Sequence, residues 1–335
     1  MEPRLTCHAD VLGAIEDPET FSSRVSVHVA VPNGMDGAEH AAFRAVVDRC
    51  FTGERVAEFE QQLRDIVQVP GNAPLEVMTA LARPFAAAAQ CAYLGWGPDA
   101  AQALLTWSVD SQAATRSRDR AELDRVAARF DAIIRAQLDA ARSKPGATLT
   151  HMLLHEKVHD RPLTDAEIVS IVRNWTAGEL ATIAAAVGIV VEFLARRTDV
   201  QQLLRDQPST RQAAMDEMLR IEAPLLTNRR RTTREVEVGG RSVPADSPVT
   251  IDWAAAHRDA TVFDDPDAFR LDRDPADNLL YGRGPHYCPG EGLSRLELGV
   301  VLDVLLATIP AFHLVEPPVR ASAPAAGFAE VRIGW

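Results

Sequence analysis

The sequence predicts a mainly α-helical fold with a small β region inserted late in the chain. Apolar residues recur with i, i+3 and i+4 spacing along most of the 335 residues, which is the period of a helix with one buried face. Alternation and turn signals are confined to residues 231–253. Because 47% of the residues are apolar, the chain can bury a sizeable core.

Six stretches have the helical period and are expected to form the main helices: residues 55–67, 74–93, 120–142, 165–196, 210–220 and 293–309. The fourth begins with Thr164-Asp-Ala-Glu167, which has the form of a capping box. Its pattern continues for about 30 residues without proline, or about 45 Å, so this helix would cross the whole domain. Asp36-Gly-Ala-Glu39 is a similar start, ahead of a shorter helix that carries His40 and Arg44.

Residues 231–253 are expected to form short strands. Glu235-Val-Glu-Val alternates, Gly239-Gly240 is a turn signal, and Val249-Thr-Ile follows Pro244-Ala-Asp. A small sheet is therefore predicted between the fifth and sixth helices.

Composition excludes several classes of protein. The net charge of −12 disfavours binding to nucleic acid, which requires neutralisation of phosphates by Lys and Arg. The four cysteines have no CxxC or framework spacing, so we expect no disulfide and a reducing compartment. The N-terminus lacks a signal-peptide pattern, and no uncharged apolar run reaches the ~18 residues typical of a membrane span. We expect a cytoplasmic protein that does not associate with a membrane.

The most informative segment surrounds Cys288, in Tyr281-Gly-Arg-Gly-Pro-His-Tyr-Cys288-Pro-Gly-Glu. Its glycines allow tight turns and close backbone approach, and its two prolines limit the conformations available. An apolar helix follows at once, so the sulfur would lie near a helix N-terminus, where N–H groups and the dipole favour an anion. The segment is therefore expected to hold a thiolate in a rigid loop.

This segment resembles the cytochrome P450 signature Phe-Gly-x-Gly-x-His/Arg-x-Cys-x-Gly, with Tyr281 as the one departure. The resemblance implies a heme b cofactor whose iron is bound by the Cys288 thiolate. It places Gly282 and Gly290 in the cofactor-binding loop. Further matches extend over nearly the whole chain, which implies a single P450-like heme domain over residues 1–335.

Two other family motifs are present. Glu217-Met-Leu-Arg220 resembles the Glu-x-x-Arg motif, and Arg273 matches its third partner, which implies a buried network that serves folding. The buried propionates of heme need cationic or hydrogen-bonding partners. The resemblance assigns that role to four residues: His40, Arg44, Arg230 and His286.

The long helix departs from the family, which usually has Ala-Gly-x-Asp/Glu-Thr to relay protons. In Ala177-Gly-Glu-Leu-Ala-Thr182, Leu180 aligns with the acid and Ala181 with the alcohol. Glu179 and Thr182 lie one position away, about 100° around the helix, and are the remaining candidates for catalytic groups. A structural role is an alternative for both: Thr182 would pack or bond to a backbone carbonyl. Leu180, Ala181 and Leu226 are expected to line an apolar substrate pocket.

Pro289 follows the ligand and has no N–H to donate to the sulfur, which would make the sulfur a stronger electron donor, unless Pro289 only stiffens the loop. With the missing relay, this leaves three options. A substrate group or ordered water supplies protons, peroxide replaces dioxygen, or the reaction is not hydroxylation.

The fold is expected to be reduced at its N-terminus, because the family's first helix and strands have no counterpart. Residues 22–36 and 107–120, which normally roof the pocket, look abbreviated. We therefore expect an open distal site for a large or carrier-bound substrate, or one completed by another chain. The alternative is a reduced fold with a small substrate.

These features predict a heme-thiolate oxidoreductase that tailors an organic specialised metabolite by hydroxylation or oxidative coupling. A ferredoxin-type donor would supply electrons, unless peroxide is used. The alternatives are a peroxygenase, a thiolate-heme isomerase or dehydratase, and a catalytically silent heme-binding regulatory protein.

Overall fold

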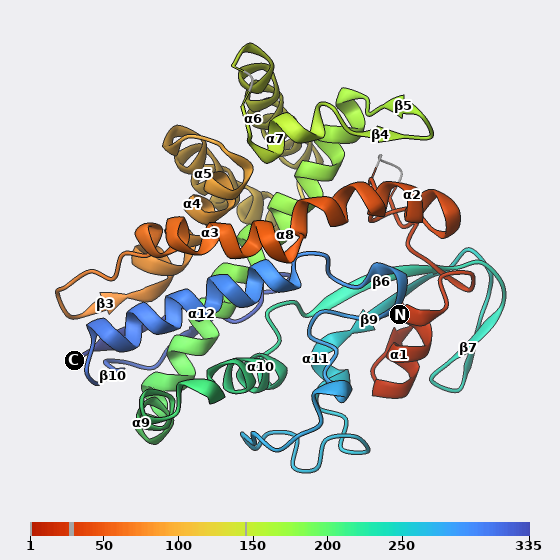
Figure 1. Cartoon of the computed structure of the whole chain (residues 1–335). Helices are drawn as coiled ribbons and strands as arrows, with labels where there is room; N and C mark the ends of the chain where they lie inside the picture. The colour runs from red at the N-terminus through yellow and green to blue at the C-terminus, as the bar shows by residue number, and fades with distance from the viewer. Residues whose placement is uncertain (1, 27–29, 145) are drawn as a thin grey trace.

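The structure, a computed structural model, describes residues 2–26, 30–144 and 146–335 and is mainly helical (Figure 1). The six predicted helices are present. The α-helices are α1 His8–Glu16, α2 Gly37–Asp48, α3 Gly53–Ile66, α4 Arg83–Leu94, α5 Pro98–Ser117, α6 Arg120–Ser143, α7 Leu149–Leu153, α8 Asp165–Arg196, α9 Thr198–Asp206, α10 Arg211–Ile221, α11 Trp253–Ala256 and α12 Glu291–Thr308. The predicted fold class is confirmed.

The 32-residue helix α8 runs through the molecule and contacts α4, α6, α10 and α12 (Figure 1). Its predicted capping box is confirmed: the Thr164 hydroxyl accepts the N–H of Glu167, and the Glu167 carboxylate accepts the N–H of Thr164. By length and composition α8 could cross a membrane, but 78% of its most apolar window is buried inside the protein. It is the central helix of the core.

The strands are short and form several small sheets. The largest has the order β1-β9-β6-β2, in which β1 Arg4–Leu5 pairs in parallel with β9 Pro248–Asp252, and β6 Thr227–Thr232 pairs antiparallel with both β9 and β2 Phe21–Ser22. β7 Val236–Val238 and β8 Arg241–Val243 pair antiparallel across the predicted turn at Gly239-Gly240. The others are β3 Leu75–Glu76, β4 Lys157–Val158, β5 Arg161–Pro162, β10 His313–Leu314, β11 Val319–Arg320, β12 Phe328–Glu330 and β13 Arg332–Gly334.

Three elements differ from the prediction. The stretch 74–93 begins with β3 and a π-helical turn at Met78–Ala82 before α4 starts. β6 begins before residue 231, and it was missed because its Asn and Arg residues have no apolar alternation. Residues 107–120 lie mostly within α5, a helix that was not predicted because two of its four buried residues are alanines: Ala100, Leu104, Trp107 and Ala114.

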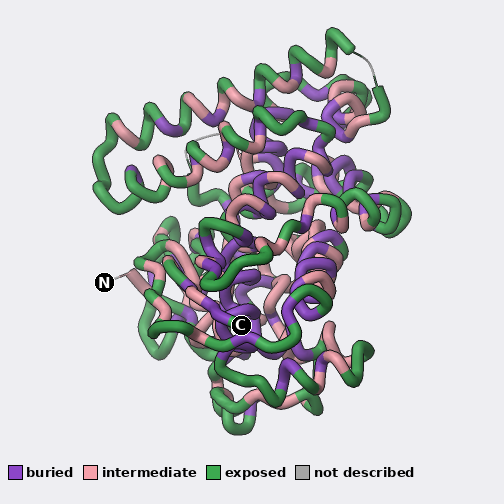
Figure 2. The backbone as a smooth tube through the Cα atoms, turned by 90° about the vertical axis from the view of Figure 1, so that its left-hand side faces the viewer, coloured by how far each residue is buried: buried purple, intermediate pink, exposed green. Residues whose placement is uncertain are grey.

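The core has two parts. A large cluster joins α2 to α8, α10 and α12, and a smaller one packs α1 against the β6–β9 region. Figure 2 shows the buried positions concentrated in the interior and the exposed ones at the periphery. The segment carrying Cys288 passes between the β region and α12, beneath α8, and this arrangement positions the site.

Candidate heme site

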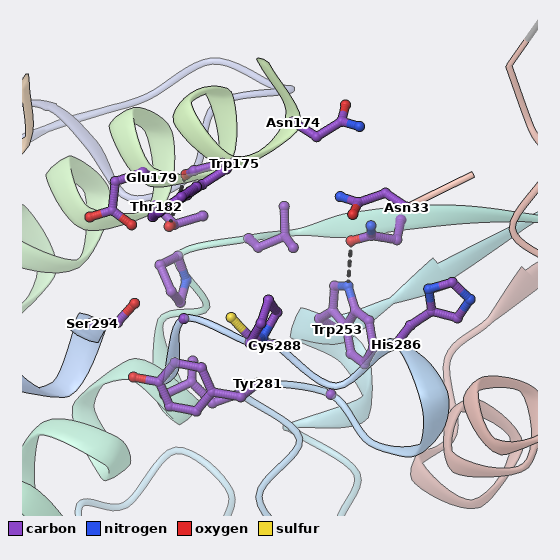
Figure 3. A pocket seen from close by; sticks show the side chains of 18 of the residues that line it. Asn33, Asn174, Trp175, Glu179, Thr182, Trp253, Tyr281, His286, Cys288 and Ser294 are labelled. Carbon is purple, nitrogen blue, oxygen red and sulfur yellow. Dashed lines mark hydrogen bonds between the residues drawn. The ribbon is translucent and has the colours of Figure 1, made fainter. Parts of the chain in front are cut away.

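A cavity of about 450 Å³ lies between α8 and the Cys288 loop (Figure 3). It brings together residues from α2, α8, β6 and the loop, which are far apart in the sequence. All nine residues predicted to bind the cofactor or to act in catalysis line it: His40, Arg44, Glu179, Thr182, Arg230, Gly282, His286, Cys288 and Gly290.

Cys288 is held by the backbone of its loop. Its N–H donates to the Tyr281 carbonyl at 2.9 Å, and Gly282 and Gly284 have φ of 71° and 67°, a region that favours glycine. A Cβ at Gly284 would lie 2.8 Å from the carbonyl oxygen of Ile15, so the loop packs directly on the end of α1. The loop is therefore closely packed, with no room for a side chain at Gly284.

Burial opposes ionisation of the Cys288 thiol. Burial raises the pKa of its thiol to about 11, and the hydrogen bond from the Gly290 backbone N–H only partly offsets this effect. The start of α12 therefore does not by itself produce a thiolate, because the cost of burying the anion is larger. A metal cation at the sulfur would deprotonate it outright.

Cationic and hydrogen-bonding groups converge beside the loop. The rings of His40 and His286 lie 4.1 Å apart, and Arg44 donates to the Pro285 carbonyl at 3.1 Å. Arg230 is 9% exposed, faces the cavity, and forms no ion pair within the described residues; burial lowers its pKa. The charge of Asp36 only partly opposes this effect, so a buried cation without a direct ion pair indicates that an anionic group belongs here.

Asp36 also belongs to this cluster, although sequence reasoning gave it only the role of a helix start. Its carboxylate accepts from the Ser22 hydroxyl and the Ser23 N–H, and it lies 3.5 Å from His286 Nε2, while Ser23 Oγ is 3.0 Å from that nitrogen. Its side chain does not cap α2. Asp36 lies just before a helix, so the sequence suggested only a capping role. Its contact with His286, far away in the chain, arises from the fold.

The face of α8 that lines the cavity differs from the predicted one. It consists of Ile171, Asn174, Trp175, Gly178, Glu179, Thr182, Ile183 and Ala186. Leu180 is buried, Ala181 is exposed away from this stripe, and Leu225 lines the cavity in place of Leu226. Leu180, Ala181 and Leu226 therefore do not line this cavity, and for the two α8 residues the reason is that one helix position is a rotation of about 100°. Their role in a substrate pocket stays a prediction.

Thr182 and Glu179 point toward the cavity from this face (Figure 3). The Thr182 hydroxyl donates to the Gly178 carbonyl at 3.0 Å, so the expected bond to a backbone carbonyl is confirmed. Glu179 contacts Glu297 of α12, a fully buried residue that sequence reasoning missed. Nothing in the sequence near either residue indicated that they would meet.

The three residues of the Glu-x-x-Arg network meet away from the cavity. Arg220 Nε is 2.7 Å and Arg273 Nε is 2.9 Å from the Glu217 carboxylate, and the Arg220 and Glu217 side chains are 1% and 5% exposed. Arg220 also donates to the carbonyls of His257 and Pro266. This arrangement ties α10 to the segment that precedes the Cys288 loop.

A heme fits both features of the cavity, because its iron can bind the sulfur of Cys288 and its propionates can pair with the cationic side chains. The fold and the cavity therefore define the chain as a heme-thiolate protein.

The chain belongs to the cytochrome P450 family, whose model matches residues 97–318. It is 28% identical to probable cytochrome P450 127A1 of Sinorhizobium fredii, over 99% of this chain and 83% of that protein. It is 30% identical to nocardicin C N-oxygenase of Nocardia uniformis subsp. tsuyamanensis, over 94% and 83%. A solved structure of a P450 EryK mutant in complex with erythromycin B superimposes with a TM-score of 0.88 at 26% identity, covering 98% and 90%. The cofactor is heme b, and the enzyme class is heme-thiolate monooxygenase.

Proposed function

We propose that this chain tailors a bulky specialised metabolite, free or tethered to a carrier, by hydroxylation or oxidative coupling. The observation that carries the proposal is the lining of the cavity, which includes no described residue between Phe51 and Ile171. The helices α5 and α6 fall within this span and do not roof the cavity. A cavity that α5 and α6 do not close favours a large substrate.

Similarity to tailoring enzymes supports the class of substrate. The chain is 30% identical to erythromycin C-12 hydroxylase of Saccharopolyspora erythraea, over 90% of this chain and 80% of that protein. Asn33 and Asn174 add amide groups to the cavity, so a substrate with several oxygen or nitrogen atoms could be oriented there.

Each group in the cavity has one proposed role. Heme, when bound, supplies the oxidising chemistry. Cys288 holds its iron, and His40, Arg44, Arg230 and His286 hold its propionates. The α8 face from Ile171 to Ala186 positions the substrate above the heme.

Substrate binding tests the proposal through the Soret band of the ferric protein, which shifts when a ligand alters the iron's surroundings. We expect a carrier-tethered acyl substrate, or a macrolide-sized compound, to bind at least about tenfold more tightly than a small fragment of the same compound, because more apolar area is buried. If the fragment binds as tightly as the large compound, the substrate is small.

The source of oxidising equivalents is tested by three parallel reactions. Turnover with reductant and a ferredoxin system supports the proposed oxygenase, whereas turnover with peroxide alone indicates a peroxygenase. Product formed without oxidant indicates an isomerase or dehydratase. Heme binding without any turnover indicates a regulatory protein.

A further inference from the structure

Two glutamates face each other in the contact between α8 and α12. Glu179 is 8% exposed and Glu297 is fully buried. Neither carboxyl forms an ion pair with an Arg, Lys or His within the described residues. Both oxygens of Glu297 and Oε1 of Glu179 are buried without a hydrogen-bond donor in that part of the chain. As two carboxylates, they would repel each other without compensation.

A proton resolves this conflict, because a protonated carboxyl donates a hydrogen bond to the other. Burial, and next the charge of Glu179, raise the pKa of Glu297 well above its ordinary value. Burial also raises the pKa of Glu179, and the hydrogen bond with Glu297 partly opposes that rise. Nearby, burial raises the pKa of Tyr93 on α4, so this neighbour stays neutral and adds no further charge to the pair.

The pair is connected to the cavity. Glu179 lines it on the same face of α8 as Thr182, one turn further along the helix. Ser294 and Leu298, which flank Glu297 on α12, also line it. The Glu179 side chain therefore connects the pair to the cavity that Cys288 also lines.

We propose that Glu179 and Glu297 form a proton-holding pair that supplies protons to the cavity, in place of the acid and alcohol absent at Leu180 and Ala181. This inference rests on the proposed oxygenase function. With both carboxyls protonated, Glu179 releases one proton to an acceptor in the cavity. The proton on Glu297 is then shared by both groups and stabilises the single negative charge. Solvent in the cavity returns the proton to Glu179, and Glu297 acts through it as a positioning residue.

Infrared spectroscopy of the heme-loaded protein tests the pair without turnover. At neutral pH we expect a C=O stretch of protonated carboxyls that shifts in D₂O and loses part of its intensity in Glu297→Gln, which keeps only the Glu179 carboxyl of the pair. Glu192→Gln is the matched control, since Glu192 is 3% exposed but pairs with Arg196 at 2.7 Å. This variant should keep the full intensity. If the wild type lacks the band, or if Glu297→Gln retains the full intensity, the inference is overturned.

Glu297→Asp covers the case in which Glu297→Gln does not fold. It keeps a carboxyl but withdraws it by one methylene, so the band should persist at a shifted frequency. An unshifted band in Glu297→Asp would assign the proton to another residue and overturn the inference.

Turnover provides a second measurement, because hydrogen peroxide brings its own protons whereas dioxygen requires them from the protein. The ratio of dioxygen-driven to peroxide-driven turnover should fall about 10²-fold in Glu179→Gln and Glu297→Gln, and remain unchanged in Glu192→Gln. An unchanged ratio in the first two variants contradicts the inference. If the wild type turns over with neither oxidant, the proposed function fails, while the infrared result still decides the existence of the pair.

Discussion

Cys288 is subject to two opposing influences, since burial favours the thiol whereas the N–H of Gly290 and a bound cation favour the thiolate. The first prediction concerns this residue. Cys288→Ser and Cys288→His should abolish the strongly red-shifted Soret band of the reduced carbonyl complex, because that band requires a sulfur ligand. The exposed Cys7 is the control, and Cys7→Ser should retain the band. Heme-loaded wild type without the band would exclude thiolate ligation.

The second prediction concerns the buried network. Glu217→Gln leaves Arg220 buried without its counter-ion and should lower the free energy of unfolding by about 3–5 kcal/mol. Glu222→Gln removes a more exposed partner, because the side chain of Arg320 is 58% exposed, and should cost less than about 1 kcal/mol. Urea unfolding of the three proteins measures both values. Equal effects would show that the Glu217 network does not stabilise the fold.

The sequence predicted those site residues that belong to motifs. His286 and Cys288 share one loop, and His40 and Arg44 share one helix turn, so local geometry already keeps each pair together. The sequence did not identify which α8 residues line the cavity. A shift of one position along a helix replaces a lining side chain with a buried one, as at Leu180, or an exposed one, as at Ala181. Glu297 could not be found at all, since its partner lies on a different helix.

At the scale of elements, periodicity predicted the helices whose buried stripe consists of many or of large apolar residues, such as α6, α8 and α12. It failed for α5, because two of its four buried residues are alanines, and for the π-helical turn before α4, which has no sequence period of its own. Contacts with neighbouring helices, and not local pattern, define these elements.

The third prediction concerns the Cys288 loop as an element. Gly284→Ala places a methyl group 2.8 Å from the Ile15 carbonyl at a φ of 67°, and should destabilise the protein by about 1–3 kcal/mol. Gly292→Ala has nothing within 4 Å of its new methyl group and lies inside α12, so it should be neutral or stabilising. Thermal unfolding of the heme-loaded variants compares them. A fully stable Gly284→Ala would show that the loop can move away from α1.

At the scale of the molecule, the fourth prediction concerns pH. Burial lowers the pKa of His257 to about 3, and its Nε2 accepts the N–H of Leu279 at 3.1 Å, so the folded protein keeps this ring neutral. The unfolded chain takes up a proton near pH 6.5, so this contribution to stability is complete above pH 6.5 and declines as the pH falls toward about 3, by roughly 1.4 kcal/mol per pH unit.

Urea unfolding between pH 4.5 and about 7.5 measures this slope. His257→Gln keeps an acceptor for Leu279 but does not titrate, and should therefore show a shallower loss of stability at acid pH. The exposed residue His159 is the control, and His159→Gln should keep the wild-type slope. Identical slopes in all three proteins would show that His257 is protonated in the fold.

The central position of α8 has a consequence for synthesis. Ribosomes complete residues 165–196 well before α10 and α12, against which this helix packs. Its apolar faces must therefore remain uncovered until the last part of the chain emerges, and until heme can enter beside Cys288. A nascent chain of this kind depends on chaperones and on prompt heme supply, so low temperature and added heme precursor should raise the yield of soluble protein more than stronger transcription does.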